Sequence, residues 1–221
     1  MVRGLKRAVQ KTIEERGWAL IATDGGSKGT CFEDRKASTG IALGHKCWSG
    51  EVEGLDQTSY NAELWALYKL VITIKGVRGR VVVIIDNQAV ACEASMRLGG
   101  SGSTKTNCAR LWNRIQEALR KGPNCDFHWV PWHGKKQGWW SPPRGYREEE
   151  WRELNKAADG AATSAQEKQW IKQTLFRKHL QTTNMRTQAA LQRLWRGAET
   201  CRRNYPEKYS DGKGNHKKGK A

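Results

Sequence analysis

Two runs of apolar residues in the first half of the chain each end in an aspartate. Residues 81–85 are five consecutive β-branched residues followed by Asp86, and the apolar segment 18–23 is followed by Asp24. A continuous β-branched run is typical of a strand buried on both faces of a sheet. Ligands of open α/β sheets bind at the carboxyl ends of the strands, so the two aspartates mark a candidate site.

The remaining pattern of apolar and polar positions predicts further strands and helices. Residues 58–74 form the clearest helix, because apolar side chains recur there at helical spacing and Thr58 or Ser59 can cap its start. Other strands are expected at 18–24, 38–48, 50–55, 79–86 and 125–131, and other helices at 88–98, 104–121 and 147–165. This order predicts an α/β fold, a mixed five-stranded sheet with helices on its faces.

The charge is concentrated at the two ends of the chain. Of the formal net charge of +17, residues 166–221 carry +10 and residues 1–17 carry +3. An excess this large indicates a polyanionic partner. We expect five parts: a basic N-terminal leader (1–17, a short helix or a loose segment), a compact domain (18–165) with an inserted loop (134–154), a basic amphipathic helical extension (166–203) and a disordered Lys-rich tail (204–221).

Cysteine usage and hydropathy indicate an intracellular protein. The six cysteines are scattered without a C-x-x-C pair, which is typical of reduced thiols. Cys125 and His128 have a spacing that suggests a metal site, but on one strand they would lie on opposite faces. No apolar run reaches the roughly 18–20 residues that span a bilayer. We expect the nucleus or cytoplasm, with an organelle not excluded, although Glu14 and Glu15 argue against a transit peptide.

Four acids, considered together, indicate a metal site. Taken singly, Asp24 fits a turn, Asp86 a helix cap, and Glu63 and Asp159 fit exposed helix positions. Brought to one end of a sheet, four carboxylates would repel one another unless cations bound them. Divalent ions with oxygen ligands satisfy that need, and two such ions can bind a phosphodiester and activate water.

Five segments resemble, in order, the motifs of ribonuclease H type 1, and the resemblance covers about residues 18–165. They are Thr23-Asp24-Gly25-Gly26-Ser27, Asn61-Ala62-Glu63-Leu64, Ile85-Asp86-Asn87-Gln88, Trp129-Val130-Pro131-Trp132-His133-Gly134 and Asn155-Lys156-Ala157-Ala158-Asp159. The looser form of the motifs is more similar to retroelement-associated members than to a housekeeping bacterial enzyme. The resemblance implies the ribonuclease H-like fold, and hydrolysis of the RNA strand of RNA/DNA hybrids with two Mg²⁺ ions, or Mn²⁺.

The resemblance also implies roles for individual residues. Asp24 would bridge both ions, Glu63 and Asp86 would complete one metal shell, and Asp159 would hold the ion that positions the water. His133 matches the histidine that assists proton transfer or product release, which suits an ordinary histidine pKa. Contacts to 2′-hydroxyls distinguish RNA from DNA, and the candidates for these contacts are Gly25, Gly26, Ser27, Asn61 and Gln88.

Two departures from the family pattern leave alternatives open. The long segment between His133 and Asp159 would be a lid, a stacking element or a partner surface. The linker 99–103 is too short for a basic substrate-binding protrusion, so the extension 166–203 either binds phosphates as a basic arm or packs on the domain. The rival functions are an inactive ribonuclease H-like module that binds nucleic acid or scaffolds an assembly, and a different nuclease or transposase on the same fold.

Overall fold

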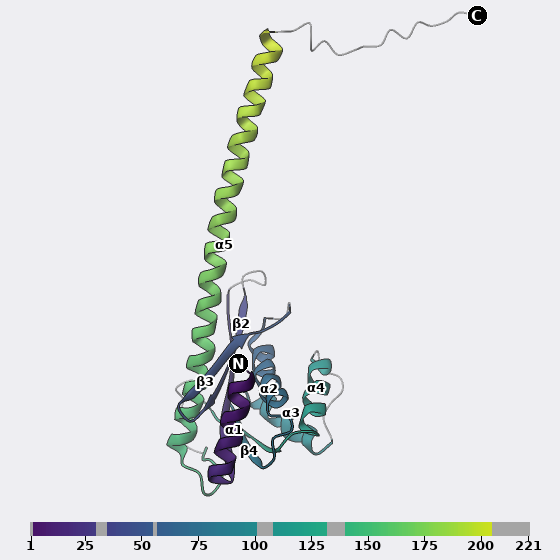
Figure 1. Cartoon of the computed structure of the whole chain (residues 1–221), viewed down its shortest axis with the longest axis vertical. Coiled ribbons are helices and arrows are strands. Elements are labelled where there is room, and N and C mark those ends of the chain that lie inside the picture. Colours follow the sequence, from purple (N-terminus) through teal and green to yellow (C-terminus); the bar gives the residue numbers. More distant parts are fainter. Residues whose placement is uncertain (1, 30–34, 55–56, 101–107, 132–139, 205–221) are drawn as a thin grey trace, which may run out of the picture. The chain divides into compact units, whose positions relative to one another are not determined.

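The computed structural model describes residues 2–29, 35–54, 57–100, 108–131 and 140–204. The elements follow one another as α1 (Val2–Arg16), β1 (Trp18–Lys28), β2 (Lys36–Leu43), β3 (Lys46–Glu51), α2 (Ser59–Thr73), β4 (Arg80–Ile85), α3 (Gln88–Leu98), α4 (Ala109–Leu119), β5 (Asn124–Trp129) and α5 (Glu148–Asn204), as Figure 1 shows. The chain divides into two compact units, residues 1–171 and 172–221.

The first unit is built on one mixed sheet with the strand order β3-β2-β1-β4-β5. Strands β1, β2 and β3 pair antiparallel, whereas β1 pairs parallel with β4 and β4 pairs parallel with β5. The predicted fold class, a five-stranded mixed sheet flanked by helices with a helical C-terminal extension, is confirmed.

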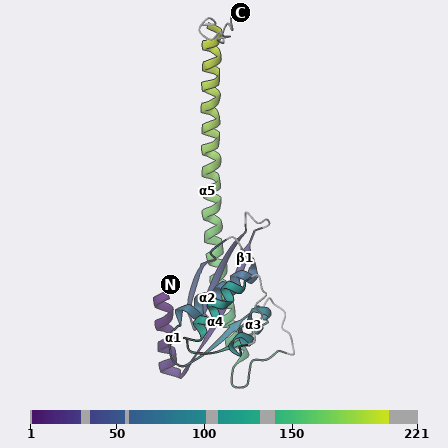
Figure 2. The same cartoon turned by 90° about the vertical axis from the view of Figure 1, so that its right-hand side faces the viewer.

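The two faces of the sheet bury alternate residues of the central strands. Val81, Val83 and Ile85 of β4 pack in the cluster formed with α1, α2, α3 and α4. Val82 and Ile84 pack in a second cluster with Trp151, Leu154 and Ala158 of α5. Figure 2 shows helices α1 to α4 together on one side of the sheet. A strand covered on both faces must be apolar at every position, which explains the β-branched run.

Residues 2–16 are an integral part of this core, which corrects the prediction of a separate basic leader. They form helix α1, and Leu5 and Val9 are fully buried in the cluster that α2 and the sheet form. Gly79 has a φ of 118° and lies against the Ile13 side chain, so α1 packs closely on the turn before β4. Basic and acidic side chains occupy the exposed face of α1, which is why its composition resembled a leader.

The predicted boundaries of two further segments are wrong. A single strand was expected at 38–48, but Gly44 adopts a φ of 56° and turns the chain, so that β2 and β3 form a hairpin. The expected inserted loop (134–154) overlaps the helix that was also expected from residue 147. The structure agrees with the helix: α5 begins at Glu148, and Trp151 is fully buried in the second cluster, so the loop does not extend to residue 154.

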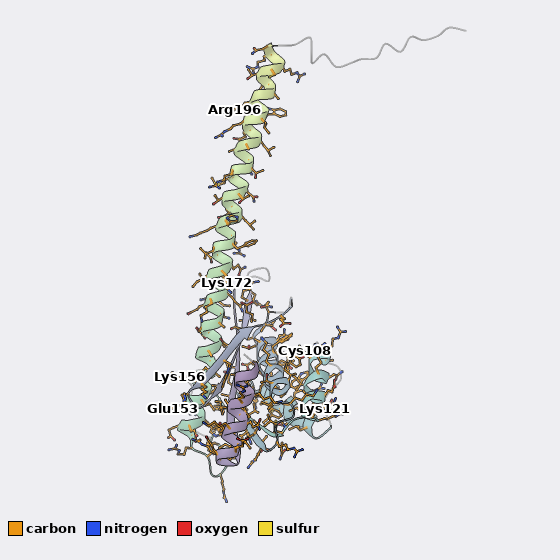
Figure 3. The ribbon with its side chains drawn as sticks, viewed as in Figure 1. Cys108, Lys121, Glu153, Lys156, Lys172 and Arg196 are labelled. Atoms are coloured by element: carbon orange, nitrogen blue, oxygen red, sulfur yellow. The ribbon has the colours of Figure 1, made fainter. Side chains whose placement is uncertain are left out.

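Helix α5 is continuous, although it belongs to both units. Gln166 and Gln169 are buried and donate to the backbone carbonyls of Lys36 and Ala37. The compact unit therefore continues to Ile171, beyond the predicted boundary at residue 165. From Lys172 to Asn204 every residue is exposed apart from the half-buried Gln173, and Figure 3 shows Lys172 and Arg196 on this part of the helix.

Candidate metal centre

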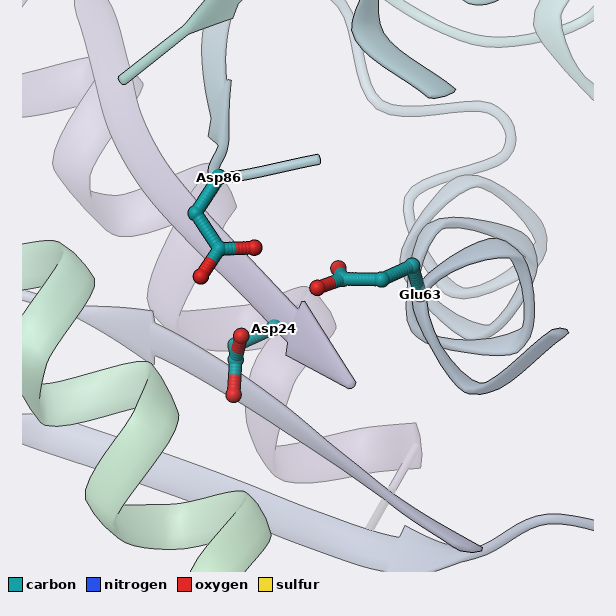
Figure 4. Close-up of side chains that lie close together, drawn as sticks. All are labelled: Asp24, Glu63 and Asp86. Atoms are coloured by element: carbon teal, nitrogen blue, oxygen red, sulfur yellow. The ribbon is translucent and has the colours of Figure 1, made fainter. Parts of the chain in front are cut away.

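Three carboxylates from separate elements converge at one end of the sheet. Asp24 lies on β1, Glu63 on α2 and Asp86 directly after β4. Each offers an oxygen, and these oxygens all lie within 4.8 Å of one another. Figure 4 shows the three side chains pointing toward the same point. This arrangement matches three of the four acids predicted from the sequence.

The parallel pairing of β1 with β4 places Asp24 beside Asp86. Thr23 pairs with Ile85, so the next residue of each strand is an aspartate at the same level of the sheet. The chain then bends, and the Asn87 side chain accepts a hydrogen bond from the Val90 N–H and caps α3. The cap is therefore Asn87, and the Asp86 carboxylate is directed toward the other acids.

Gly25 allows α2 to bring Glu63 to the two aspartates. A Cβ on Gly25 would lie 2.1 Å from the Glu63 nitrogen, a distance that no side chain can occupy. The start of α2 is also fixed by the Thr58 side chain, which accepts from the Asn61 N–H. Glycine at position 25 is thus required for the close approach of β1 and α2.

Burial and mutual repulsion raise the pKa values of two of these acids. Asp24 and Glu63 are each 4% exposed. Burial, followed by the charges of Asp86 and Asp159, raises the pKa of Asp24 from 3.8 to about 8. Burial is also the main reason that the pKa of Glu63 lies well above its ordinary value, although a hydrogen bond from the Gly25 backbone opposes the shift.

The donor set fits a hard divalent cation. All three groups supply carboxylate oxygens, which Mg²⁺ and Mn²⁺ prefer. The Oε2 atom of Glu63 is buried and has no hydrogen-bond partner among the described residues. A buried carboxylate oxygen without a donor is costly, and a cation at this point would satisfy it.

The fourth predicted acid, Asp159, lies near this cluster on α5 without being part of it. Its side chain is half-buried, and its charge contributes to the raised pKa of Asp24. Its oxygens are not among those that lie within 4.8 Å of one another. That Asp159 holds a second ion stays a prediction.

The predicted substrate residues lie on the elements that carry the acids. Gly26 and Ser27 follow Asp24 on β1, and the Ser27 hydroxyl lies 2.9 Å from the Ser59 hydroxyl. Asn61 is 6% exposed in the first turn of α2, and Gln88 is exposed at the start of α3. No ligand tests their role. His133 lies outside the described residues.

Gly40, which the sequence did not single out, and Asn155, the first residue of the fifth motif, also shape this site. A Cβ on Gly40 would lie 2.0 Å from the Ala158 carbonyl oxygen, so this glycine lets α5 approach β2. Asn155 is fully buried, and neither amide atom has a hydrogen-bond partner among the described residues. The packing that makes Gly40 necessary joins segments more than a hundred residues apart, and no local pattern reveals it.

Cys125 and His128 do not converge on a metal ion. Cys125 packs with the cluster on the α2 side of the sheet, whereas His128 contacts Trp151 on the α5 side. Burial raises the pKa of the Cys125 thiol to about 12, which disfavours the thiolate that metals bind.

Within the described residues, no helix has both the length and the apolar composition to cross a membrane.

Solved structures with the same fold include ribonuclease H domains. The solution structure of the PFV RNase H domain superposes with a TM-score of 0.50 at 21% identity, over 67% of this chain and 93% of that chain. The crystal structure of the prototype foamy virus protease-reverse transcriptase superposes with a TM-score of 0.50 at 20% identity, over 67% of this chain and 20% of that chain.

These superpositions define the class to which the structure belongs. The molecule is an α/β protein with an acidic cluster at the carboxyl end of its central strands. More specifically, the chain has the ribonuclease H fold, as its five motifs predict. No model of a protein family matches the sequence, and no curated protein matches it.

Proposed function

We propose that this protein is a metal-dependent ribonuclease H that hydrolyses the RNA strand of RNA/DNA hybrids. The observation that carries the proposal is the cluster of Asp24, Glu63 and Asp86, three carboxylates within 4.8 Å at the end of a ribonuclease H sheet. Two of them are almost fully buried, so the cluster is stable in ionised form only with cations.

Each acid would contribute one part of a site for two ions. Asp24, which the other carboxylates surround, would bridge both ions, and Glu63 and Asp86 would complete one of the two shells. Asp159 would complete the other from α5. When bound, Mg²⁺ or Mn²⁺ supplies the positive charge that polarises a phosphodiester and lowers the pKa of water.

The surrounding residues would bind and orient the nucleic acid. Gly25 is buried and Gly26 half-buried beside Asp24 on β1, and Ser27, Asn61 and Gln88 supply short polar side chains on the same or neighbouring elements. Such groups can contact 2′-hydroxyls in the minor groove of a hybrid. We place His133 in proton transfer or product release, as the motif implies.

The part of α5 beyond residue 171 would act as a basic arm for phosphates. Residues 172–204 contain eight Lys or Arg residues and one acidic residue, and they are exposed. An exposed excess of positive charge of this size indicates a polyanionic partner, so we expect a nucleic acid here. A retroelement-associated origin agrees with the superposition on the foamy virus protease-reverse transcriptase.

The test is cleavage of an end-labelled RNA/DNA hybrid with Mg²⁺, with single-stranded RNA and duplex DNA as competing substrates. Asp86→Asn is expected to abolish cleavage, because it removes one negative charge and one metal ligand. Glu117→Gln is the matched control, since this acid lies on α4 in an exposed ion pair with Lys121.

Hybrid-specific, metal-dependent cleavage that is lost in Asp86→Asn and retained in Glu117→Gln would support the proposal. Tight binding of the hybrid without cleavage by the unmodified protein would contradict it. That result would favour the alternative function, an inactive ribonuclease H-like module that binds nucleic acid or scaffolds an assembly.

A further inference from the structure

Two lysines lie directly opposite each other where β1 ends and β2 begins. Lys28 pairs with Lys36 at the last position of the β1–β2 ladder. Side chains at directly opposed positions are close neighbours, and like charges there destabilise the sheet. An anion between the two ammonium groups would remove this repulsion.

The lysine pair lies on the same face of the sheet as Asp24. The β1–β2 register is unbroken, with Asp24 opposite Gly40, Gly26 opposite Ser38, and Lys28 opposite Lys36. Since side chains alternate along a strand, Lys28 and Asp24 point to one face, roughly 13 Å apart along β1 at about 3.4 Å per residue. The acidic cluster and the lysine pair therefore lie along one face of the sheet, and α5 packs on that face at Gly40 and Ser38.

Helix α5 packs along β1 and β2 and contacts both lysines. The Ser38 hydroxyl donates to the Ala162 carbonyl, and the Gln166 amide donates to the Lys36 carbonyl. The Lys28 ammonium lies 6.0 Å from the centre of the Trp170 ring, a cation–π contact. Trp170 thus contacts the Lys28 ammonium, while Lys28 as a residue is exposed.

We infer that Lys28 and Lys36, supported by Trp170, bind a phosphate of the nucleic acid beside the acidic cluster. The inference rests on the proposed function, and it assigns a backbone contact to residues outside the five motifs. A nucleic-acid strand carries a phosphate every 3.4 Å of helix axis. A cation pair roughly 13 Å from the acids would therefore hold the substrate a few nucleotides from the cleaved bond.

The charges nearby agree with a phosphate partner. Arg35 precedes Lys36 and Lys168 lies on α5, whereas the acids are Glu167 on α5 and Glu33 and Asp34 in the sequence between the two lysines. With Lys28 and Lys36, four basic residues stand against three acidic ones in this part of the sequence. A nucleic acid would be attracted to the lysines by its phosphates, and the divalent cations bound to it would neutralise the carboxylates.

The experiment measures hybrid binding without cleavage. Fluorescence anisotropy of a labelled hybrid in EDTA, in an Asp86→Asn background, gives the dissociation constant over a range of salt concentrations. The variant Lys28→Ala/Lys36→Ala is compared with Lys46→Ala/Lys75→Ala, which removes the same charge from exposed lysines elsewhere on the domain. Thermal melting of each variant confirms that it is folded.

We expect the Lys28/Lys36 variant to bind roughly tenfold more weakly at low salt. The slope of log K against log salt should also become shallower by about 1 to 2. The control variant Lys46→Ala/Lys75→Ala should show smaller changes in both the affinity and the salt slope. Equal affinities and slopes for the two double variants would overturn the inference.

Trp170 provides a second test. Trp170→Phe should retain hybrid affinity because a ring still faces the Lys28 ammonium, whereas Trp170→Ala should weaken binding. Equal loss in the two variants would contradict the role of the ring. Binding is read without cleavage, so an inactive protein still tests the lysines. Conversely, if the protein cleaves hybrids but its hybrid affinity does not change in the Lys28→Ala/Lys36→Ala variant, this inference is wrong and the proposed function stands.

Discussion

Asp24 and Gly40 are direct partners across β1 and β2, and Gly40 is where the backbone of α5 contacts the sheet. A Cβ at position 40 would lie 2.0 Å from the Ala158 carbonyl oxygen and 2.8 Å from the Ala162 nitrogen. The glycine opposite the central acid therefore determines how closely α5, with Asp159, approaches the acidic cluster.

Gly40→Ala should displace α5 and weaken both the fold and the site. Overpacking of this kind typically costs about 1–3 kcal/mol or more, and Asp159 would move away from Asp24. We expect a lower melting temperature and lower hybrid cleavage, measured by thermal denaturation and by the cleavage assay.

Gly160→Ala is the matched control for that variant. Gly160 lies next to Asp159 on α5, and a Cβ there would meet nothing within 4 Å. Replacing a helical glycine by alanine should stabilise the protein by about 0.5–1 kcal/mol. If Gly40→Ala were as harmless as Gly160→Ala, the close packing of α5 on β2 would be wrong.

The raised pKa of Asp24 predicts that the metal-free protein loses stability as the pH rises. The pKa is about 8 in the folded state and 3.8 ordinarily, so the folded state binds more protons. Stability is then fully present below about pH 4 and falls until about pH 8. One pKa unit corresponds to about 1.4 kcal/mol, so the loss should reach several kcal/mol.

Divalent metal should reverse this loss, because cations stabilise the ionised form of Asp24. Thermal melting between pH 4 and 8, in EDTA and in Mg²⁺, measures both effects. Asp24→Asn should flatten the pH dependence and remove the stabilisation by Mg²⁺. An unchanged pH profile in Asp24→Asn would show that another group is responsible.

Glu63→Gln should stabilise the metal-free protein while it impairs activity. Burial, followed by the neighbouring acids Asp86 and Asp24, disfavours the charge on Glu63, so a neutral amide should be more stable there than an ionised carboxylate. The same change removes a metal ligand, and cleavage should fall on the order of a hundredfold. Lower stability in EDTA would indicate that the Glu63 carboxylate makes a necessary hydrogen bond in the fold.

The sequence predicted what depends on local pattern. The β-branched run of β4 and the Asp at the ends of two apolar runs identified the central strands and two of the acids. The five motifs then predicted the fold and the third acid, Glu63, which a helical pattern alone assigned to the edge of the buried face. The contacts of Gly40 with Ala158 and of Lys28 with Trp170 join distant segments, and no local pattern reveals them.

Helix α1 is a second element whose packing the sequence pattern did not predict. Its composition is basic, and its burial is indicated only by a short apolar stripe, Leu5 and Val9 one turn apart with the half-buried Ile13 one turn further on. Leu5→Ala should cost about 2–5 kcal/mol, the range for deleting a buried Leu side chain. Ile72→Ala, at a position that is 39% exposed, should change stability by about 0.5 kcal/mol or less. Chemical denaturation of the two variants measures the difference, and equal effects would mean that α1 does not pack in the core.

Charge reversal on the part of α5 beyond residue 171 tests the basic arm. Arg186 and Arg193 are exposed and seven residues apart, so they lie on the same side of the helix. In an Asp86→Asn background, Arg186→Glu/Arg193→Glu should weaken hybrid binding and make its salt dependence shallower, because fewer counterions are released. Lys46→Glu/Lys75→Glu changes the net charge equally but outside the arm. If both double variants weakened binding to the same degree, overall charge rather than the arm would explain the affinity. A selective loss in the arginine variant would place phosphate contacts on residues 172–204.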